Sequence, residues 1–337
     1  KGPINHVAFS PDGRRVVICS ENKEVNAGEA HVLDVETGEA VFPPLRHKAG
    51  VNYAAFSPDA TGRFVVTASG DQSADTGEAR VWDASTGKAQ TPVLFHNSGV
   101  VYAGFSPDGT RVVTASHDAT ARLWHLANLE EPTTLHHDSS VNRASFSPDG
   151  RYLATASRDR TARVWNVVTG DALTPMLFHA GTVSSATFSP NGRWLATSSR
   201  NTAQVWNLDT GSQPPAVLNT VGPVKLVQSS ASGQRVITVS RAAENSSDVV
   251  QVWEFESGER VADLESEQEV SVAALSADGR FAVSTSKSTG EKQTKLKIWD
   301  VSSGRLKTKL EDPEGHVGPV AFSHDGRSLV AGTYSHR

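Results

Sequence analysis

Ser, His and Asp, the three residue types of a nucleophilic triad, recur together along this chain. One set comprises His96, Ser116 and Asp118, and another comprises His137, Ser157 and Asp159. A Ser hydroxyl activated by a His, with the His oriented by an Asp, could attack an acyl group. One enzyme does not need several equivalent triads, however, so the recurrence favours a structural role. We therefore expect no catalytic residue and a chain that is not an enzyme.

The sets follow an internal repeat that is marked by one short phrase. The phrase reads FSPDG at Phe9–Gly13, Phe105–Gly109 and Phe146–Gly150, and altered copies stand at residues 56–60, 188–192, 275–279 and 322–326. A more divergent copy covers residues 227–233. Successive copies are spaced by about 45 residues, which is the period of a four-stranded propeller blade.

Each period contains the pattern of four short strands. In the fourth period, residues 141–146 alternate in polarity, as expected of a strand with one buried face. The Ser-Pro-Asp-Gly that comes next is a turn sequence, because Pro presets φ and Gly adopts positive φ. Residues 152–157 and 161–165 are predicted as the second and third strands, and residues 172–178 as a weaker edge strand. A blade alone leaves both faces unburied, so we expect an all-β ring of blades.

On these residues the chain resembles the WD-repeat (tryptophan–aspartate repeat) β-propellers, in particular the repeats of large bacterial WD-repeat proteins. The dipeptide position is occupied by Leu33-Asp34, Trp82-Asp83, Trp124-His125, Trp165-Asn166, Trp206-Asn207, Trp253-Glu254 and Trp299-Asp300. The resemblance implies a single domain over residues 1–337, a seven-bladed β-propeller of four-stranded antiparallel blades. The expected blades are residues 1–47, 48–96, 97–137, 138–179, 180–219, 220–267 and 268–312.

Residues 313–337 read as two further strands, which would be half of an eighth blade. Three arrangements fit this remainder: seven blades with a trailing hairpin, an eight-position ring with one position half filled, or the start of a second propeller. We favour seven complete blades in a fragment of a larger multidomain protein.

The resemblance also implies buried His–Ser–Asp–Trp hydrogen-bond networks that hold the blades together. The complete sets are His96, Ser116, Asp118, Trp124 and His137, Ser157, Asp159, Trp165. The partial sets are His47, Ser69, Asp71, Trp82 and His179, Ser199, Trp206. A hydrogen bond to a charged Asp contributes about 1.5–3 kcal/mol when it is satisfied.

These networks also orient the domain, because the His precedes a blade and the Asp lies at the corner between its second and third strands. The two can bond only if both connections lie on one face, which also carries long corners at residues 20–30, 71–79, 241–248 and 287–295. The candidate partner-binding residues on this face are Tyr53, Tyr102, His117, Arg143, Arg158, Ser185 and Arg200. Arg and Tyr are enriched at interaction hot spots, so we expect this face to bind an acidic or phosphorylated segment.

Composition argues against several other classes of function. A net charge of −5 argues against a nucleic-acid partner, and no apolar run approaches the length of a membrane span. The single cysteine, Cys19, excludes an intramolecular disulfide framework and a Cys-rich zinc site. We expect a cytoplasmic protein without a metal or a cofactor.

The sequence therefore predicts a non-catalytic protein–protein interaction scaffold or sensor domain. Its partner would be a protein, a peptide or another domain of the parent chain. A structural spacer within a longer propeller array is the alternative. A propeller enzyme with a central-channel site is disfavoured, because the first strands offer mostly Val, Ala, Ser, Asn and Tyr there.

Overall fold

The computed structural model describes residues 3–22, 27–71, 76–199, 202–209, 216–230, 232–242, 247–265, 269–287, 294–312, 316–323 and 328–334. Within these ranges the regular structure consists of thirty strands, β1 to β30, without a helix. The described residues accordingly include no helix that is long and apolar enough to cross a membrane.

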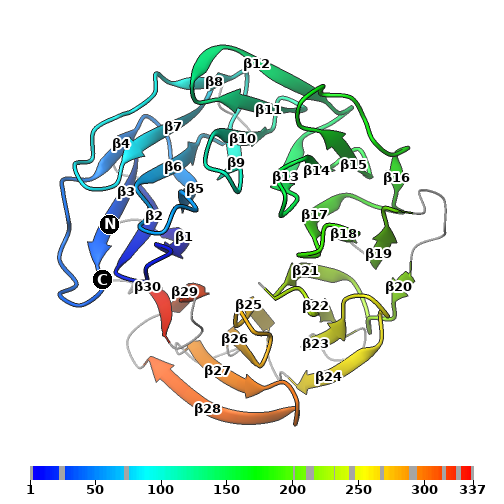
Figure 1. Cartoon of the computed structure of the whole chain (residues 1–337). Coiled ribbons are helices and arrows are strands. Elements are labelled where there is room, and N and C mark those ends of the chain that lie inside the picture. Colours follow the sequence, from blue (N-terminus) through cyan, green and yellow to red (C-terminus); the bar gives the residue numbers. More distant parts are fainter. Residues whose placement is uncertain are drawn as a thin grey trace. The chain divides into compact units, whose positions relative to one another are not determined.

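Seven antiparallel sheets, here called blades one to seven, are each formed by four consecutive strands (Figure 1). Blade one contains β1 (Ile4–Phe9), β2 (Arg15–Asn22), β3 (Ala27–Asp34) and β4 (Leu45–His47). Blade two contains β5 (Val51–Phe56), β6 (Phe64–Ser69), β7 (Gly77–Asp83) and β8 (Leu94–His96). Blade three contains β9 (Val100–Phe105), β10 (Arg111–Ser116), β11 (Thr120–His125) and β12 (Asn128–His136). Blade four contains β13 (Val141–Phe146), β14 (Tyr152–Ser157), β15 (Thr161–Asn166) and β16 (Leu177–Phe178).

The remaining strands continue the same order. Blade five contains β17 (Val183–Phe188), β18 (Trp194–Ser199), β19 (Ala203–Asn207) and β20 (Ala216–Leu218). Blade six contains β21 (Val224–Ser229), β22 (Arg235–Arg241), β23 (Asp248–Glu254) and β24 (Arg260–Glu265). Blade seven contains β25 (Glu269–Leu275), β26 (Phe281–Lys287), β27 (Thr294–Asp300) and β28 (Arg305–Asp312). A two-stranded sheet of β29 (His316–Phe322) and β30 (Leu329–Tyr334) comes last, so the predicted fold of seven blades with an additional hairpin is confirmed.

The chain divides into two compact units. One unit comprises Lys1–Asp159 with Val164–Leu173, and the other comprises Arg160–Arg163 with Thr174–Arg337. The first unit contains blades one to three and most of blade four, and the second contains blades five to seven with β29 and β30.

The FSPDG phrase forms the turn between the first and second strands of a blade. In blade three, the Ser106 hydroxyl donates to Asp108 Oδ1 (2.5 Å) and accepts the Arg111 N–H (2.9 Å). Gly109 has a φ of +68°, a conformation that L side chains rarely adopt. The hydrogen bond from Ser106 holds the pKa of the Asp108 carboxyl below its ordinary value. The Ser–Asp bond recurs in blades one, two, four and seven, so five blades share this turn between their first and second strands.

The residue after the Trp closes the turn between the third and fourth strands. Asp83 accepts hydrogen bonds from the N–H groups of Ser85 (3.0 Å) and Thr86 (2.9 Å), and Gly87 comes next with a φ of +69°. The Ser85 hydroxyl and these N–H groups together lower the pKa of Asp83 to about 2. The aspartate of the dipeptide is therefore a turn residue, and Asn166 fills the same role in blade four.

The fourth strand of every blade carries one Leu opposite the residue three positions before the Trp, or before Leu33 in blade one. The seven are Leu45, Leu94, Leu135, Leu177, Leu218, Leu264 and Leu310. All except the last are at most 8 % exposed. Leu45, Leu94, Leu135, Leu218 and Leu264 each belong to a hydrophobic cluster that contains the Trp of the following blade. The Leu of one blade is thus buried by the Trp of the next.

The hairpin β29–β30 packs on blade seven, on the face that points away from blade six. Val320, Phe322 and Leu329 cluster with Val283 and Leu296 of that face. Leu310 lies on the same face, opposite Leu296 in the register of β27 with β28, and remains 53 % exposed.

We expect the two equivalent Leu residues of blades six and seven to respond differently to truncation. Leu264→Ala removes a side chain that is 0 % exposed, so the free energy of unfolding should fall by about 2–5 kcal/mol. Leu310→Ala, the matched control, should change the stability by about 0.5 kcal/mol or less because its side chain is half exposed. Urea denaturation of both variants measures the difference, and equal losses would contradict this packing scheme.

Candidate functional site

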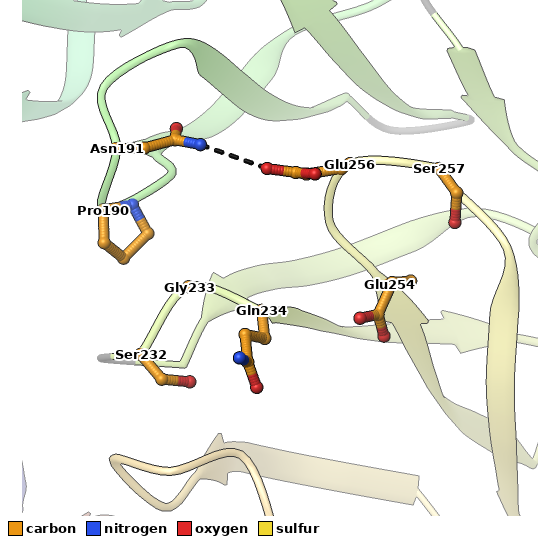
Figure 2. Close-up of a pocket in the computed structure, with 8 residues that line it drawn as sticks. All are labelled: Pro190, Asn191, Ser232, Gly233, Gln234, Glu254, Glu256 and Ser257. Atoms are coloured by element: carbon orange, nitrogen blue, oxygen red, sulfur yellow. Dashed lines mark hydrogen bonds between the residues drawn. The ribbon is translucent and has the colours of Figure 1, made fainter.

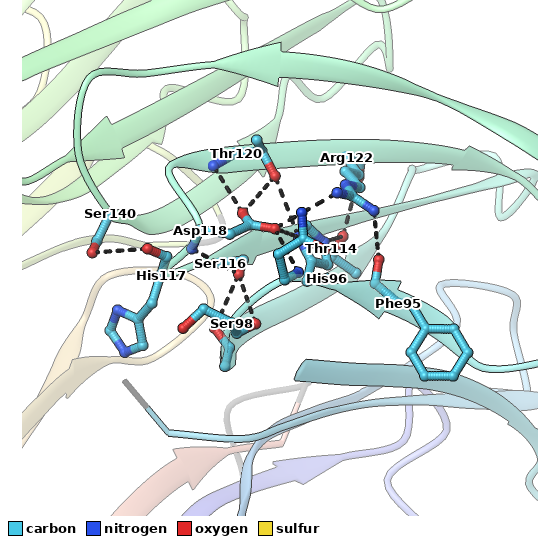
Figure 3. A network of polar contacts seen from close by, with 12 residues as sticks. Phe95, His96, Ser98, Thr114, Ser116, His117, Asp118, Thr120, Arg122 and Ser140 are labelled. Atoms are coloured by element: carbon cyan, nitrogen blue, oxygen red, sulfur yellow. Dashed lines mark hydrogen bonds and ion pairs between the residues drawn. The ribbon is translucent and has the colours of Figure 1, made fainter. Parts of the chain in front are cut away.

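The polar network of blade three is built from four side chains of different elements, of which Figure 3 shows His96, Thr114 and Asp118. His96 is the last residue of β8, Thr114 lies in the middle of β10, Asp118 comes after β10 and Trp124 lies in β11. His96 Nδ1 is 2.9 Å from Asp118 Oδ2, and His96 Nε2 is 2.6 Å from Thr114 Oγ1. The Trp124 indole N–H donates to the same Thr114 oxygen at 2.9 Å. The hydroxyl of Thr114 therefore joins the indole to the imidazole.

The hydroxyl in this network differs from the expected one. Ser116 donates instead to the carbonyl oxygens of Ser98 (2.9 Å) and Gly99 (3.2 Å), and accepts the Asp118 N–H (3.1 Å). The strand register explains this difference. Trp124 pairs with Val112, so its indole lies within reach of Thr114, which is two residues further along β10. Ser116 is two residues further still, at the end of the strand. Ser116 therefore fixes the corner that carries Asp118, and the sequence assignment of the bridging hydroxyl was wrong.

Blade four repeats the arrangement with its own residues. His137 Nδ1 is 2.7 Å from Asp159 Oδ2, and its Nε2 is 2.7 Å from Thr155 Oγ1. The Trp165 indole N–H donates to Thr155 at 2.8 Å. Ser157 takes the corner role here, donating to the Ser139 carbonyl at 3.0 Å.

Blade two keeps the His and Trp but uses another carboxylate. His47 Nε2 is 2.7 Å from Thr67 Oγ1, which also accepts the Trp82 indole N–H at 2.8 Å. Glu78 of β7 approaches His47 Nδ1 at 3.5 Å, and Asp71 is exposed. Glu78 therefore takes the place beside the imidazole that Asp118 occupies in blade three. Ser69 again donates to a loop carbonyl, that of Ala49, at 2.8 Å.

Blade five retains only the part of the network around Trp206. Its indole N–H donates to Thr197 Oγ1 at 2.7 Å, and Ser199 lies 3.1 Å from the Thr202 hydroxyl. His179 packs edge-on against Trp206 with ring centroids 5.8 Å apart, and neither of its ring nitrogens has a hydrogen-bond partner among the described residues. Burial lowers the pKa of His179 to about 4, so this imidazole is neutral at neutral pH.

The bond from the indole to a hydroxyl is common to every blade that has the Trp. In blades six and seven, Trp253 donates to Thr238 (2.8 Å) and Trp299 donates to Ser284 (3.0 Å). Blade one lacks both partners, because Ile18 and Leu33 occupy the two register positions of the hydroxyl and the indole. The sequence contains this signal, a Thr or Ser ten or fifteen residues before most of the Trp residues, which we did not recognise.

The protonation states and burial of the blade three network favour a structural role over a catalytic one. Burial raises the pKa of Asp118, but the hydrogen bonds from His96 and Thr120 outweigh it and hold the pKa well below the ordinary value. Burial lowers the pKa of His96, so a neutral imidazole donates through Nδ1 and faces the Thr114 hydroxyl with Nε2. Thr114 and Ser116 are both fully buried, so neither hydroxyl is open to attack a substrate.

A second constellation of side chains lines the first strands of blades one to four. It is formed by the third residue of each strand, and we call these four residues the aromatic–arginine column: His6, Tyr53, Tyr102 and Arg143. The rings of His6 and Tyr53 have centroids 3.8 Å apart, and those of Tyr53 and Tyr102 are 4.5 Å apart. The Arg143 guanidinium lies 4.8 Å from the Tyr102 ring centroid and 5.6 Å from that of Tyr53. The column thus ends in a cation that rests on two tyrosine rings.

Local backbone geometry places these residues in the column. In each of the four strands the register with the second strand shifts between the first and third residues, which is the mark of a β-bulge. Asn5 and Asn52 stand at the bulge and donate to the carbonyls of Val51 and Val100 in the next blade, both at 2.9 Å. Gly104 leaves room for Tyr102, because a Cβ there would lie 2.7 Å from the tyrosine oxygen. The bulge therefore turns the third residue toward its counterpart in the next blade.

The column carries a single positive charge. Arg143 forms no ion pair with any carboxylate of the described residues. Burial and the Arg143 charge lower the pKa of His6 to about 3, so this ring stays neutral. Burial and neighbouring Tyr53 raise the pKa of Tyr102, which keeps its hydroxyl protonated. His6 was missed in the sequence analysis, although it holds the same place in its strand as Tyr53.

The other candidate partner-binding residues are not part of the aromatic–arginine column. His117 comes directly after β10, where its carbonyl accepts the Ser140 hydroxyl at 3.3 Å, and burial and Arg158 lower the pKa of its ring. Arg158 occupies the equivalent corner of blade four and is exposed. Ser185 belongs to the second unit, where its hydroxyl lies 3.5 Å from the Val227 carbonyl, and Arg200 lies outside the described residues.

The long corners are partly strand extensions. In blade one, β2 and β3 continue to the pair Asn22↔Ala27, and in blade seven β26 and β27 continue to Lys287↔Thr294. The tips of the four corners, at residues 23–26, 72–75, 243–246 and 288–293, lie outside the described residues.

A pocket of about 400 Å³ opens between the turns of blades five and six (Figure 2). Asn191 donates to Glu256 at 3.1 Å across it, and Glu254 lines the same wall. The pocket forms where the two turns meet, because Gly233 packs so closely on Pro190 that a Cβ would lie 1.4 Å from the proline ring. Glu256 is exposed, so the pocket is open to solvent.

Comparison with known proteins identifies the repeat. The family model described as "WD domain, G-beta repeat" matches residues 1–26, 90–125, 130–166 and 173–207. No curated protein matches the chain. Among solved structures, the crystal structure of the computationally designed Ika8 protein is similar, with a TM-score of 0.76, 22% sequence identity, and coverage of 98% of this chain and 93% of that one. At this identity the likeness shows the fold.

Removing the bridging hydroxyl should destabilise blade three. Thr114→Val keeps the shape but leaves the Trp124 N–H and His96 Nε2 buried without a partner, at a cost of about 1–3 kcal/mol for each group. Thr133→Val, on an exposed position of β12, serves as the control and should be nearly neutral. Thermal and urea denaturation compare the two, and equal stabilities would show that the hydroxyl is not a support.

Acid should destabilise the protein through His179. The pKa of His179 is about 4 in the folded chain and about 6.5 when unfolded, so the unfolded chain binds the proton more readily. Above pH 6.5 the ring is neutral in both states, and between pH 6.5 and 4 its contribution to stability falls by up to about 3 kcal/mol. His179→Phe should remove this part of the pH dependence. Urea denaturation at pH 7.5 and 4.5 measures it, and identical pH profiles of parent and variant would refute the assignment.

Proposed function

Since four segments of the chain match the WD-repeat model and the sheets form propeller blades, we propose that it is a non-catalytic protein-interaction domain that binds an acidic or phosphorylated segment at the aromatic–arginine column. The observation that carries the proposal is the Arg143 guanidinium, which rests on Tyr53 and Tyr102 and has no carboxylate partner among the described residues. Protein or peptide binding is common in this family, whereas the acidic partner is argued from this chain alone.

The chemistry of the column favours an anion as the contact group. A guanidinium presents planar N–H donors that bind carboxylate or phosphate oxygens in pairs. Its stacking on two rings fixes its plane before the partner arrives, so little side-chain entropy is lost on binding. Tyr and Arg are also the residue types that dominate interaction hot spots.

The surroundings of the column support a peptide rather than a small substrate. His117 and Arg158 stand at the corners of blades three and four, and Arg158 adds an exposed cation within the same unit. An extended segment could contact these corners while one of its acidic side chains meets Arg143. The buried networks of blades three and four would hold the corners rigid, which makes the domain a scaffold for recognition.

Substitution of the column cation should weaken binding of acidic peptides. The probe is an array of peptides that carry Glu, phosphoserine or neutral Gln at one position, applied to the parent chain and to Arg143→Gln. We expect the parent to prefer the anionic peptides and Arg143→Gln to lose about tenfold or more in affinity, because a hydrogen bond to a charged group contributes about 1.5–3 kcal/mol.

Arg193→Gln is the matched control, because Arg193 is an exposed arginine of the second unit that pairs with Asp209 at 3.5 Å. It should bind the array as the parent does. Unchanged affinity in Arg143→Gln, or no preference of the parent for anionic peptides, would refute the proposal.

A further inference from the structure

Two phenol rings lie in contact at the centre of the aromatic–arginine column. The rings of Tyr53 and Tyr102 have centroids 4.5 Å apart and planes tilted by 47°. Aromatic pairs in proteins have centroids about 4.5–7 Å apart, so this pair lies at the close end of that range. The chain has four tyrosines, and the other two, Tyr152 and Tyr334, belong to β14 and β30. The first strands of blades two and three therefore bring together two side chains of the same oxidisable type.

The hydroxyl ends of the two rings converge on one cation. Burial disfavours the charge of Arg143, but Tyr53 and Tyr102 outweigh it and raise the pKa of the guanidinium. Burial and the Tyr53 phenol together raise the pKa of Tyr102. Each phenol thus acts on its neighbour or on the same guanidinium through its hydroxyl end. The ring carbons ortho to the hydroxyl, which are the positions where two tyrosyl radicals couple, lie beside these converging ends.

The backbone and the packing hold the two rings in place. Asn52 ties β5 to β9 through its hydrogen bond to the Val100 carbonyl at 2.9 Å. Tyr53 and Tyr102 pack against two different hydrophobic clusters, so each ring is supported from its own side. Both side chains are only half-buried. The pair therefore combines a fixed contact with access for an oxidant.

The most reactive competitors in the same unit are buried. Cys19 is 0 % exposed, and burial raises the pKa of its thiol, so the reactive thiolate does not form. The indoles of Trp82, Trp124 and Trp165 are at most 8 % exposed. Oxidation of this unit is thereby directed toward its half-buried tyrosines.

We propose that Tyr53 and Tyr102 are a modification site at which a one-electron oxidant, such as a peroxidase with hydrogen peroxide, forms a dityrosine crosslink. Each phenol gives up one electron and its hydroxyl proton and becomes a neutral phenoxyl radical. The two radicals join through a C–C bond between ortho carbons, and the hydrogen of each of these carbons moves to the oxygen of its ring. Two electrons and two protons leave in total, and they reduce one hydrogen peroxide to two waters. The new bond joins blade two to blade three.

Oxidation of the dilute chain with a peroxidase and hydrogen peroxide tests the site. We expect dityrosine fluorescence in a product that remains monomeric on a denaturing gel. Mass spectrometry of a protease digest should show the peptides of Tyr53 and Tyr102 joined with the loss of two hydrogen atoms. The folded chain should give about tenfold or more of this crosslink than the chain oxidised in urea, because contact raises the effective concentration of the partner ring.

Three conservative variants locate the crosslink. Tyr53→Phe and Tyr102→Phe should each lose it, because a phenyl ring has no hydroxyl proton to give up. Tyr152→Phe is the matched control, since Tyr152 is also half-buried and also lies beside an arginine, with the Arg151 guanidinium 5.6 Å from its ring centroid. It should crosslink as the parent does. Circular dichroism would verify that all three variants are folded.

Equal yields in the folded chain and in urea, or an intramolecular crosslink that persists in Tyr102→Phe, would overturn the proposal. Dimers linked through Tyr152 or Tyr334 in place of the intramolecular product would also refute it. The ring of His6 lies 3.8 Å from that of Tyr53, so a digest that joins these two residues would show that the imidazole, and not Tyr102, is the coupling partner.

Discussion

The hydrogen bond from a tryptophan indole to a hydroxyl of the second strand is the interaction on which the blades depend. Six Trp residues make it at 2.7–3.0 Å, whatever else surrounds them. It satisfies two polar groups inside an apolar sheet and thereby fixes the plane of the indole. An indole held in this way presents its ring to the Leu of the preceding blade. Blade one supports this view, because Ile18 and Leu33 replace both members of the pair together.

The His and Asp side chains join this indole–hydroxyl bond in some blades, but the bond forms without them in others. Blades three and four carry both, blade two substitutes Glu78 for the Asp, and blade five leaves His179 without a described partner. Blade six uses a different arrangement, in which fully buried Asp248 binds Lys225 Nζ at 2.6 Å and the Val270 N–H at 2.6 Å. Asp248 stands at the strand position that Gly77 holds in blade two. Asp248 contacts the next blade through its carboxylate, whereas the backbone of Gly77 lies directly against Val100 of the next blade.

The sequence predicted the blades because turn chemistry and strand alternation are local properties. The FSPDG turns, the third-strand Trp and the four-strand period all appear in the sheets as expected. The bridging hydroxyl was misassigned because the choice between Thr114 and Ser116 depends on the diagonal offset of Trp124 across two strands. His6 was overlooked because its role depends on stacking against Tyr53 of the next blade. Exposure of Leu310 likewise depends on which strands come after it, which no residue in its own repeat reveals.

The leucine and tryptophan contacts also give the blades within each unit a direction. In five blades the leucine is covered by the tryptophan of the next blade, so the loss of the later blade would uncover the earlier one, while the reverse does not hold for this contact. Local opening of a protein starts where buried apolar contacts are fewest. We expect blade six to be held shut by blade seven, because Trp299 and Val301 cover Leu264. Each of these contacts therefore ties the stability of one blade to that of its successor in the chain.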